Sequence, residues 1–326
     1  MSLRTVAVRV PLTEPFQGVQ ERLAVLVEGP AGWGECSPFP GYPTDHGSAW
    51  AAAREAATSP WPAPLRDRVP VAAVIGAVEP ERAERLALQV TRAWHGAGRP
   101  PAGGDLPVTV KVKIGRGDDH GRVAAVRAAL GPAARIRVDG NGALDAGTAI
   151  LLLNRLARYD LEFAEQPVAT LEELAAVRRR ARVPVAADES VHSLGAARRL
   201  AELQAADLIV LKVQPLGGVR AALAVAEAAL VPATVGSLVE TSVGLAAGLA
   251  LAACLPELPH ACGLGTAGML AGDVVTDPLV PAGGWLTVRR PAPDPRLLAR
   301  WAAHDRPAGA RAPASASASR TSETRR

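Results

Sequence analysis

Short apolar runs in the middle of this chain end, one after another, on a charged residue. Asp139, Glu165, Asp188 and Lys212 each close such a run, at intervals of 26, 23 and 24 residues. A strand, a helix and two short loops together take roughly that length. Because successive strands of a β/α repeat end on the same face of a barrel, these four side chains are predicted to converge on that face, where such barrels carry out chemistry.

Eight short segments rich in Val, Ile and Leu have the pattern of buried parallel strands, which are apolar on both faces. They are residues 70–77, 108–114, 135–139, 162–165, 184–188, 208–213, 232–236 and 260–263. Helical patterns lie between them at 148–159, 171–180, 196–203 and 219–229, while 79–107 is the least regular part. We therefore predict an α/β fold with a (β/α)8 barrel over residues 70–284.

The first 69 residues follow a different pattern. Segments 3–11 and 20–28 alternate apolar and polar residues with a period of two, and a third short strand is expected at 33–36. An Ala-rich helix is predicted at 45–57, with Thr44 or Asp45 as its N-cap. We predict an α+β domain over 1–69, to which residues 285–306 return through a short helix at 295–303.

Composition narrows the remaining possibilities. Of 326 residues, 48% are apolar and 21% are charged, which allows a sizeable core. The net charge is +4, and part of the arginine excess behind it comes from Arg320, Arg325 and Arg326 at the end of the sequence. The charge therefore gives no reason to expect nucleic-acid binding. These arginines lie in residues 307–326, an Ala-, Ser-, Arg- and Pro-rich tail that we expect to be disordered.

Cysteine usage and hydropathy predict a cytoplasmic protein. The three cysteines are an odd number without metal-binding spacing, which is typical of a reducing compartment. The N-terminus lacks the continuous apolar run of a signal peptide. The longest apolar stretch, 243–255, is too short to cross a bilayer, so we expect no membrane association.

Three of the charged strand ends are acids. Carboxylates of Asp139, Glu165 and Asp188 brought to one spot would repel each other strongly unless a cation were present. Three oxygen ligands, completed by water and substrate, suit the octahedral preference of Mg²⁺. A single acid at a strand end could equally well cap the following helix, but three at this spacing, flanked by lysines, favour a Mg²⁺ site.

Lysines stand at two of the strand ends. Lys111 and Lys113 are two positions apart on a strand and so project from the same face. Two neighbouring ammonium groups near a divalent metal are expected to lower each other's pKa, which favours a neutral amine that can accept a proton. Lys212 should approach from the other side of the barrel mouth. This layout suits abstraction of a proton next to a carboxylate, whereas lysines that merely extend to solvent would explain the pattern poorly.

Taken in order, these motifs resemble the enolase superfamily, muconate-lactonizing subgroup. They are Val110-Lys111-Val112-Lys113, Asp139-Gly140-Asn141-Gly142, Glu165-Gln166-Pro167, Ala187-Asp188-Glu189-Ser190 and Leu211–Gly218. The resemblance implies a (β/α)8-type barrel with an α+β capping domain, and a Mg²⁺ ion on the three acids. It also implies catalytic roles for Lys113, Lys212 and Lys111, with Asn141, Gln166 and Glu189 hydrogen-bonding behind them.

Within the subgroup, the motifs are similar to those of actinobacterial enzymes of menaquinone biosynthesis. Those enzymes dehydrate 2-succinyl-6-hydroxycyclohexa-2,4-diene-1-carboxylate to 2-succinylbenzoate. The resemblance implies that Lys113 removes the proton next to the ring carboxylate and then protonates the departing hydroxyl, while Lys212 stabilises the anion. Ser237 and the strand-eight amides of Gly263 and Gly265 are candidates for contacting a substrate carboxylate. We expect a monomer acting on a small carboxylate.

Two other functions use the same scaffold differently. An N-acylamino acid racemase would use Lys113 and Lys212 as opposed bases, with the same site residues. A non-catalytic barrel that binds a partner would require a lost ligand or base, and none is lost. A dipeptide epimerase is disfavoured because Gly263-Leu264-Gly265 stands where that group has Asp-x-Asp. The formal G-x-G-x-x-G pattern over 263–268 lacks the downstream acid of a dinucleotide site and is interpreted as a loop.

Overall fold

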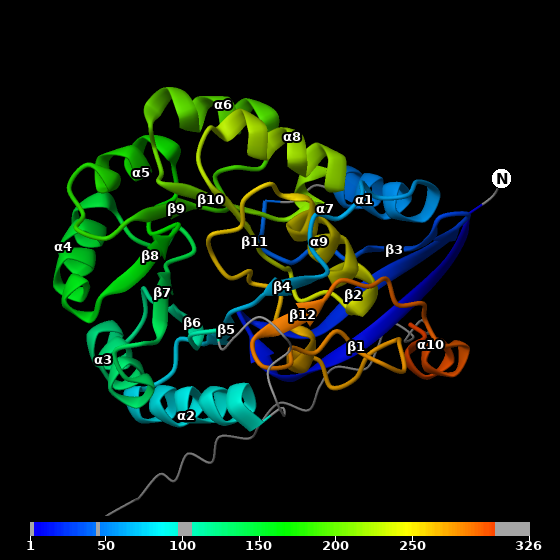
Figure 1. The fold of residues 1–326 in the computed structure, drawn as a ribbon, viewed down its shortest axis with the longest axis horizontal. Helices are drawn as coiled ribbons and strands as arrows, with labels where there is room; N and C mark the ends of the chain where they lie inside the picture. The colour runs from blue at the N-terminus through cyan, green and yellow to red at the C-terminus, as the bar shows by residue number, and fades with distance from the viewer. Residues whose placement is uncertain (1–2, 44–45, 97–105, 304–326) are drawn as a thin grey trace, which may run out of the picture.

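A computed structural model of the chain describes residues 3–43, 46–96 and 106–303. The predicted N-caps Thr44 and Asp45 and the tail 307–326 lie outside these residues. One part of the molecule is a curled parallel sheet covered by helices, and the other is a small antiparallel sheet with two helices of its own (Figure 1).

The parallel sheet has seven strands whose spatial order equals their order in the chain. They are β5 (Ala73–Ile75), β6 (Thr109–Lys113), β7 (Arg135–Asp139), β8 (Leu161–Glu165), β9 (Val185–Ala187), β10 (Leu208–Leu211) and β11 (Ala233–Val235). Helices follow the strands and form the outer arc of Figure 1. They are α2 (Pro80–Gly96), α3 (Asp119–Leu130), α4 (Ala146–Leu156), α5 (Leu171–Arg178), α6 (Leu194–Leu203) and α8 (Val219–Ala229), with the short η1 (Ala157–Tyr159) after α4.

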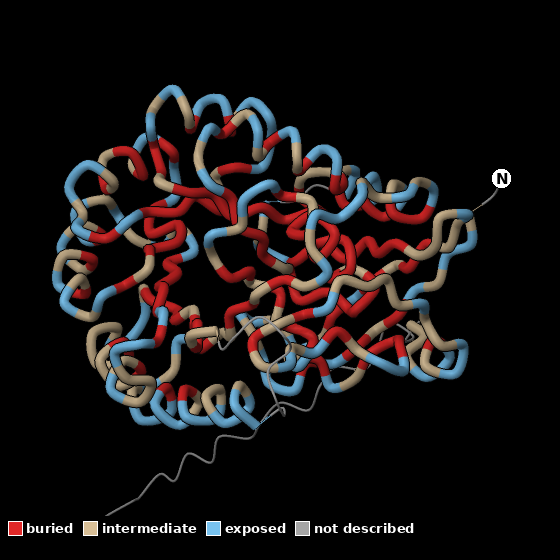
Figure 2. Tube along the Cα trace, in the orientation of Figure 1, coloured by how far each residue is buried: buried red, intermediate tan, exposed pale blue. Residues whose placement is uncertain are grey.

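Alternation along each strand divides the core into two layers. Val110 and Val112 on β6 and Ile136 on β7 belong to the large cluster packed beneath the helices. Side chains of the opposite set, such as Phe163 and Val210, form a separate cluster inside the curl. Figure 2 shows the result, with buried strands and exposed outer helix faces. Because the interior set includes the last residue of several strands, the charged strand ends lie above an interior that holds Phe163 and Val210 together with the buried polar side chains of Arg137 and Thr234.

The eighth strand, predicted at 260–263, is reduced to isolated bridges. Cys262 pairs in parallel with Val71, and Gly263 pairs in parallel with Gly236 just beyond β11. The backbone amide of Cys262 donates to Pro70 at 2.7 Å, and that of Gly263 donates to the carbonyl of Val235 at 2.7 Å. This segment therefore joins the two ends of the seven-stranded sheet. Pro259 before it and two glycines at 263 and 265 are poor strand residues, which explains why the pairing stays so short.

The predicted first barrel strand, 70–77, is divided in two. β4 (Arg68–Pro70) pairs antiparallel with β12 (Trp285–Thr287), and β5 then begins at Ala73. After Pro70, the backbone amide of Val71 donates to the carbonyl of Gly284 at 2.9 Å, and that of Ala72 donates to the carbonyl of Cys262 at 2.8 Å. The antiparallel pair ties the segment after the barrel to the segment before it. The boundaries predicted at 69/70 and 284/285 stay predictions.

The antiparallel meander predicted at the N-terminus is confirmed. It consists of β1 (Arg4–Phe16), β2 (Val19–Gly29) and β3 (Gly32–Cys36), followed by α1 (His46–Thr58). Gln17 and Gly18 form its first turn with positive φ angles, which a glycine adopts without strain. Near the C-terminus, α10 (Pro295–Trp301) is followed by a bridge between Ala302 and Val8 of β1.

Two helices lie where the two parts meet. α7 (Val213–Leu216) directly follows Lys212, and α9 (Ser242–Cys254) is buried along nearly all of its length. α9 contacts β3 of the meander as well as β4 and β11, and a further short turn, η2 (Ala267–Met269), contacts β1. Although α9 is strongly apolar, no helix among the described residues is long and apolar enough to cross a membrane.

Candidate active site

The three predicted acidic ligands lie at the carboxyl ends of adjacent strands. Asp139 ends β7 and pairs in register with Glu165, which ends β8. Asp188 follows β9 by one residue. All three carboxylates are almost completely buried, with at most 2% of each residue exposed. The two-residue period of a strand gives them the same facing, so the convergence expected from their spacing is what the structure has.

All three predicted lysines reach these acids. Lys111 Nζ lies 2.8 Å from Glu165 Oε1 and 3.0 Å from Asp139 Oδ2. Lys113 Nζ donates to Asp139 Oδ2 at 2.6 Å, and Lys212 Nζ donates to Asp188 Oδ2. The six residues therefore gather in one network of opposite charges, in which the Lys212–Asp188 pair stands beside the four directly linked residues of β6, β7 and β8. Lys111, Lys113 and Lys212 are also the only lysines of the chain, since every other basic side chain besides histidine is an arginine.

The expected lowering of the pKa is wrong for Lys111 in this structure. Burial works against the charge of Lys111, but Asp139 and Glu165 outweigh it and raise its pKa above the usual value. Lys212 behaves in the same way: burial opposes its charge, Asp188 outweighs that effect, and the pKa rises. The prediction placed the lysines beside each other and beside a metal, whereas here each ammonium contacts carboxylates directly.

The pKa values of the three acids are shifted in different directions. Burial opposes the charge of Asp139, yet Lys111 and Lys113 hold its pKa well below the usual range. Burial raises the pKa of Glu165 to about 7, with Asp139 and Asp188 adding to the effect and Lys111 opposing it. Burial and Glu189 likewise raise the pKa of Asp188. The cluster thus contains more negative charge than its lysines neutralise.

Asn141, Gln166 and Glu189 are linked to these groups by hydrogen bonds, directly or through one another. The side-chain oxygen of Asn141 accepts from Lys113 Nζ at 2.7 Å, and its NH₂ group donates to Glu189 Oε1 at 2.9 Å. Gln166 Oε1 accepts from the backbone amide of Asp188 at 2.7 Å and from Ser190 Oγ at 2.9 Å. These contacts fix the orientation of the groups that carry charge, and the supporting role expected for the three residues stays a prediction.

Tyr42, which sequence reasoning missed, closes the site from the N-terminal part. Its hydroxyl donates to Asp188 Oδ1 at 2.7 Å, and its ring centroid lies 4.1 Å from Lys212 Nζ. Burial and the nearby charge of Asp188 raise its pKa well above the usual value. A usable signal was present, because aromatic residues are only 3% of the chain and Phe16, Phe39 and Tyr42 all fall in the meander or the loop after it.

A small cavity of about 60 Å³ lies over this network. The three lysines, Ser237 and Gly263 line it from the barrel, and Phe16, Gln17, Phe39 and Tyr42 line it from the other part. Ser237 Oγ is within 2.9 Å of Thr266 Oγ1, a second hydroxyl in the lining that the sequence did not single out. Gly265, by contrast, does not line this cavity and lies against Ala72 and Pro281.

The chemistry of the donor set can be tested against a divalent cation. Asp139, Glu165, Asp188 and Glu189 bring four carboxylates to three lysines, and Glu189 Oε2 is buried without a hydrogen-bond partner. Within residues 3–43, 46–96 and 106–303, no three His, Cys, Asp or Glu side chains already surround a common point, since ammonium groups stand between the acids. The excess of carboxylate oxygen and the raised pKa of Glu165 nevertheless fit a hard cation such as Mg²⁺.

Known proteins resemble the chain in sequence along most of its length. The family descriptions "Enolase C-terminal domain-like" and "Enolase N-terminal domain-like" match residues 105–293 and 7–57. The o-succinylbenzoate synthase of Thermobifida fusca is 52% identical over 290 residues, which cover 87% of each chain. The o-succinylbenzoate synthase of Mycolicibacterium smegmatis is 43% identical over 303 residues, covering 91% of this chain and 89% of the relative.

Solved structures show the same fold at lower identity. A muconate lactonizing enzyme from Pseudomonas fluorescens, complexed with muconolactone, aligns with a TM-score of 0.79 at 21% identity, covering 92% of this chain and 98% of the other. The L-Ala-D/L-Glu epimerase of Bacillus subtilis aligns with a TM-score of 0.77 at 23% identity, covering 90% and 97%. At this identity the two likenesses concern the fold alone.

The parallel sheet, the antiparallel N-terminal sheet and the two matched family descriptions define an enzyme of the enolase type. The chain belongs to the enolase superfamily and, within it, to the family of the o-succinylbenzoate synthases. This membership confirms the resemblance seen in the motifs and the interpretation of the chain as an enzyme rather than a binding barrel.

Proposed function

We propose that this enzyme catalyses the Mg²⁺-dependent syn dehydration of 2-succinyl-6-hydroxycyclohexa-2,4-diene-1-carboxylate to 2-succinylbenzoate, a step of menaquinone biosynthesis. The observation that carries the proposal is the 52% identity to a curated o-succinylbenzoate synthase over 87% of the chain. The three lysines and three carboxylates gathered at one cavity support it, because they supply the acid–base groups that such a reaction requires.

Lys113 is the proposed base and acid. As a neutral amine it takes the proton from the carbon next to the ring carboxylate, and the electrons of that C–H bond enter the ring. The C–O bond on the same face then breaks, and the ammonium of Lys113 gives its proton to the leaving hydroxyl, so that water departs and the ring becomes aromatic. The contacts of Lys113 Nζ with Asp139 and Asn141 support this role, since they hold the amine at the cavity.

Lys111 and Lys212 are proposed to remain charged during the reaction. Both are raised in pKa by neighbouring carboxylates, which suits a group that stabilises developing negative charge rather than one that exchanges protons. Lys111 would act near the substrate carboxylate. Lys212, held between Asp188 and the ring of Tyr42, would face the ring of the substrate.

The metal ligands in this proposal are Asp139, Glu165 and Asp188. A Mg²⁺ ion there would supply a Lewis acid for the substrate carboxylate. The surplus of carboxylate over ammonium groups at the cavity supports its binding, and the partnerless oxygen of Glu189 supports the presence of positive charge nearby. Ser237 and Gly263 stay predicted contacts for the succinyl carboxylate, because both line the cavity. The prediction that Gly265 also contacts a carboxylate has no support from the lining of this cavity.

An N-acylamino acid racemase is the second candidate, and one observation favours it. Lys113 and Lys212 line the same cavity from β6 and from the end of β10, so a substrate between them would meet an amine on each face. Racemisation needs a base on both faces, whereas the syn dehydration needs only one. The two activities therefore make different demands on Lys212.

The deciding experiment offers the purified enzyme both substrates in the presence of Mg²⁺. We expect rapid formation of the aromatic product from the cyclohexadiene and slower or no racemisation of an N-succinylamino acid. Exchange of the substrate α-proton with solvent deuterium in Lys113→Ala and Lys212→Ala then shows from which face of the substrate each lysine removes a proton. If wild type racemises faster than it dehydrates, and Lys113→Ala still exchanges one enantiomer, the racemase takes the place of the synthase.

We also propose that the enzyme is cytoplasmic and monomeric. A reducing, cytoplasmic setting is supported by Cys36, Cys254 and Cys262, all of which are free thiols. We propose a monomer, in which the barrel and the N-terminal part of the same chain both line the cavity. Light scattering at micromolar concentration would test this, and a stable dimer would contradict it.

A further inference from the structure

A buried polar network joins the N-terminal part to the barrel on the far side of Lys212. Its members come from β2, from β3 and the residue after it, from α7 and from the start of α9, and each residue is at most 6% exposed. They are Arg22, Glu35, Ser37, Gln214, Glu240 and Thr241. None of them lines the cavity, and none has a place in the proposed reaction.

Gln214 is the member that crosses the boundary. Its Oε1 accepts from the backbone amide of Ser37 at 2.7 Å, and its Nε2 donates to Ser37 Oγ at 3.0 Å. The same Nε2 lies 3.5 Å from Glu240 Oε1. A buried glutamine with both ends paired to one residue holds that residue in position and orientation, because any shift would leave polar atoms without partners in the interior.

Each end of this contact leads to Lys212. On the barrel side, Lys212 is the N-cap residue of α7, and Gln214 is the second residue of that four-residue helix. On the other side, Ser37 begins the loop that carries Phe39 and Tyr42 into the cavity lining. The ring of Tyr42 lies 4.1 Å from Lys212 Nζ. One side chain thus links the segment that carries the lysine to the loop that carries the aromatic ring, whose hydroxyl is also held by Asp188.

The network around this contact leaves little freedom for it to move. Glu35 accepts from the amides of Gly244 at 3.0 Å and Thr241 at 3.2 Å, and from Ser37 Oγ at 2.7 Å. Arg22 donates to the carbonyls of Ser37 and Val239. A Cβ atom at Gly244 would lie only 2.6 Å from that of Glu240, so the start of α9 is pressed directly against the network.

We propose that Gln214 is a positioning residue for Lys212, which it aligns with the Tyr42 ring by binding Ser37 across the boundary between the two parts. The inference rests on the proposed function only in that Lys212 is taken to act on the substrate. It adds a residue outside the cavity on whose hydrogen bonds the geometry of that lysine depends.

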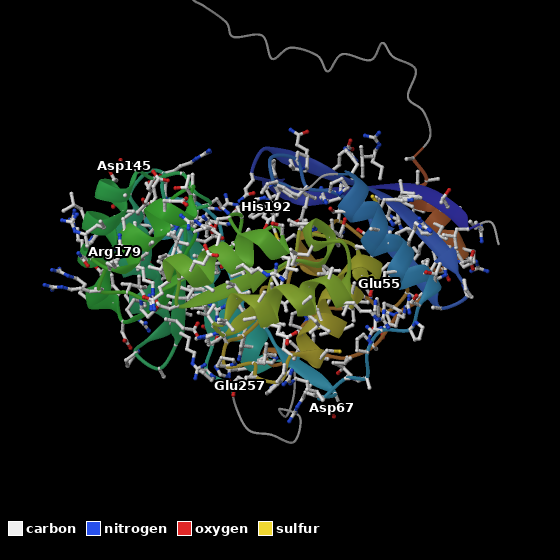
Figure 3. The ribbon with its side chains drawn as sticks, turned by 90° about the horizontal axis from the view of Figure 1, so that it is seen from above. Glu55, Asp67, Asp145, Arg179, His192 and Glu257 are labelled. Atoms are coloured by element: carbon white, nitrogen blue, oxygen red, sulfur yellow. The ribbon has the colours of Figure 1, made fainter. Side chains whose placement is uncertain are left out.

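A second contact across the same boundary supplies the matched control. Glu55 of α1 accepts from the guanidinium of Arg220 at 2.9 Å and from the backbone amide of Val219, at the start of α8. Figure 3 shows Glu55 on α1, close to the barrel helices. Arg220 is exposed and does not line the cavity. Arg220→Met therefore weakens the attachment of the two parts without reaching Lys212, whereas Gln214→Met removes the polar contact that does.

The experiment combines kinetics with an observation of the lysines themselves. Because the chain has only three lysines, protein labelled with lysine that is ¹³C-enriched at Cε shows three Cε signals, all from the candidate site. We expect Gln214→Met to shift the Lys212 signal, which the Tyr42 ring current influences, and to leave those of Lys111 and Lys113 in place. We expect its kcat to fall tenfold to a hundredfold, on the order of the loss from a 1 Å misplacement, with KM changed less than about threefold.

Arg220→Met should move none of the three signals and should keep kcat within about twofold of wild type. An unmoved Lys212 signal with wild-type kcat in Gln214→Met overturns the proposal. So does a parallel loss of kcat and melting temperature in both variants, because Gln214 would then only help to hold the parts together. If Gln214→Met does not fold, Ser37→Ala, which keeps the backbone amide and removes the hydroxyl, is judged by the same two criteria.

Failure of this inference is distinct from failure of the proposed function. A wild-type enzyme that does not dehydrate the cyclohexadiene contradicts the function. Gln214→Met is then judged on racemisation of the N-succinylamino acid, in which Lys212 also takes part, and on the lysine signals, which need no substrate.

Discussion

Two clusters of buried carboxylates lie within one molecule, and they are neutralised by different means. At the barrel mouth, Asp139, Glu165 and Asp188 are held by lysine ammonium groups. At the boundary between the parts, Glu35 accepts from backbone amides and hydroxyls, whereas Arg22 of the same network acts on it only through its nearby charge. A flexible ammonium can exchange its carboxylate for a substrate or a cation, but an amide fixed in a helix cannot move away. The first cluster is suited to chemistry and the second to position.

The pKa values of the acids show that burial acts on both clusters alike. Burial raises the pKa of Glu165 to about 7 at the mouth and that of Glu35 to about 7 at the boundary. Burial likewise raises the pKa of Glu240. The two clusters differ in how a buried carboxylate can still be stabilised. A cation can relieve Glu165, whereas Glu35 can only take up a proton, so the two clusters should respond to different additions to the solution.

The largest expected effect is at the mouth. Lys113→Ala removes the group that we assign to both proton transfers, so we expect a loss of kcat/KM on the order of 10⁴-fold or more. Lys212→Arg keeps a positive charge beside Asp188 and should retain a trace of dehydration. Steady-state assays of both variants provide the measurement. Comparable residual activity in the two would remove the distinction between the base and the charge-stabilising lysine.

A smaller effect concerns the response to metal. If Mg²⁺ binds the mouth cluster, a concentration 100-fold above its Kd should raise the free energy of unfolding by about 2.7 kcal/mol, and chelation should abolish dehydration. Asp188→Asn should weaken the stabilisation strongly, because it removes one of three proposed ligands. Denaturant unfolding with and without Mg²⁺ measures this.

The boundary cluster provides the matched control for that experiment. Glu240→Gln makes the same chemical change at a buried carboxylate and should keep the full response to Mg²⁺. Full dehydration activity in chelated enzyme, together with an unaffected Asp188→Asn, would contradict the assignment of a metal to the mouth.

The mouth cluster could be predicted from the sequence, whereas the boundary cluster could not. Asp139, Glu165 and Asp188 each end a local apolar run, and a β/α repeat places such positions together whatever else the chain does. Ser37 and Gln214 are 177 residues apart. No periodicity links residues of two different folding patterns, so this pairing had no signal in the sequence.

Two predictions about the barrel, its eighth strand and the direction of the lysine pKa shifts, depend on geometry that the sequence pattern does not contain. The eighth strand at 260–263 was predicted from its apolar residues, but the prolines and glycines around it allow only single bridges. The direction of the lysine pKa shifts depends on which charges lie nearest, and strand spacing does not determine that. One sequence signal was stronger than the motifs: a chain rich in arginine keeps lysine at only three positions, and arginine cannot lose its proton at ordinary pH.

The smallest expected effect distinguishes the boundary cluster by pH. Glu35 faces Glu240 and Arg22, and burial lifts its pKa from 4.5 to about 7. The folded protein therefore binds this proton more tightly than the unfolded chain does. The stabilisation from that proton is fully present below pH 4.5 and is lost as the pH rises through 7. Between about pH 5.5 and 8 the loss should amount to about 2 kcal/mol.

Glu35→Gln isolates this contribution because a glutamine does not titrate. The variant loses acceptor capacity toward Thr241 and Gly244, so it should be less stable than wild type at acidic pH, but by an amount that changes little with pH. The decline in unfolding free energy from pH 5.5 to 8, measured in urea with chelator present, should be smaller in Glu35→Gln than in wild type. Glu257→Gln, at an exposed position visible in Figure 3, serves as the control and should decline like wild type. Equal declines in all three proteins would mean that Glu35 keeps its charge throughout, and that the amides of α9 compensate a buried carboxylate as fully as the lysines do at the mouth.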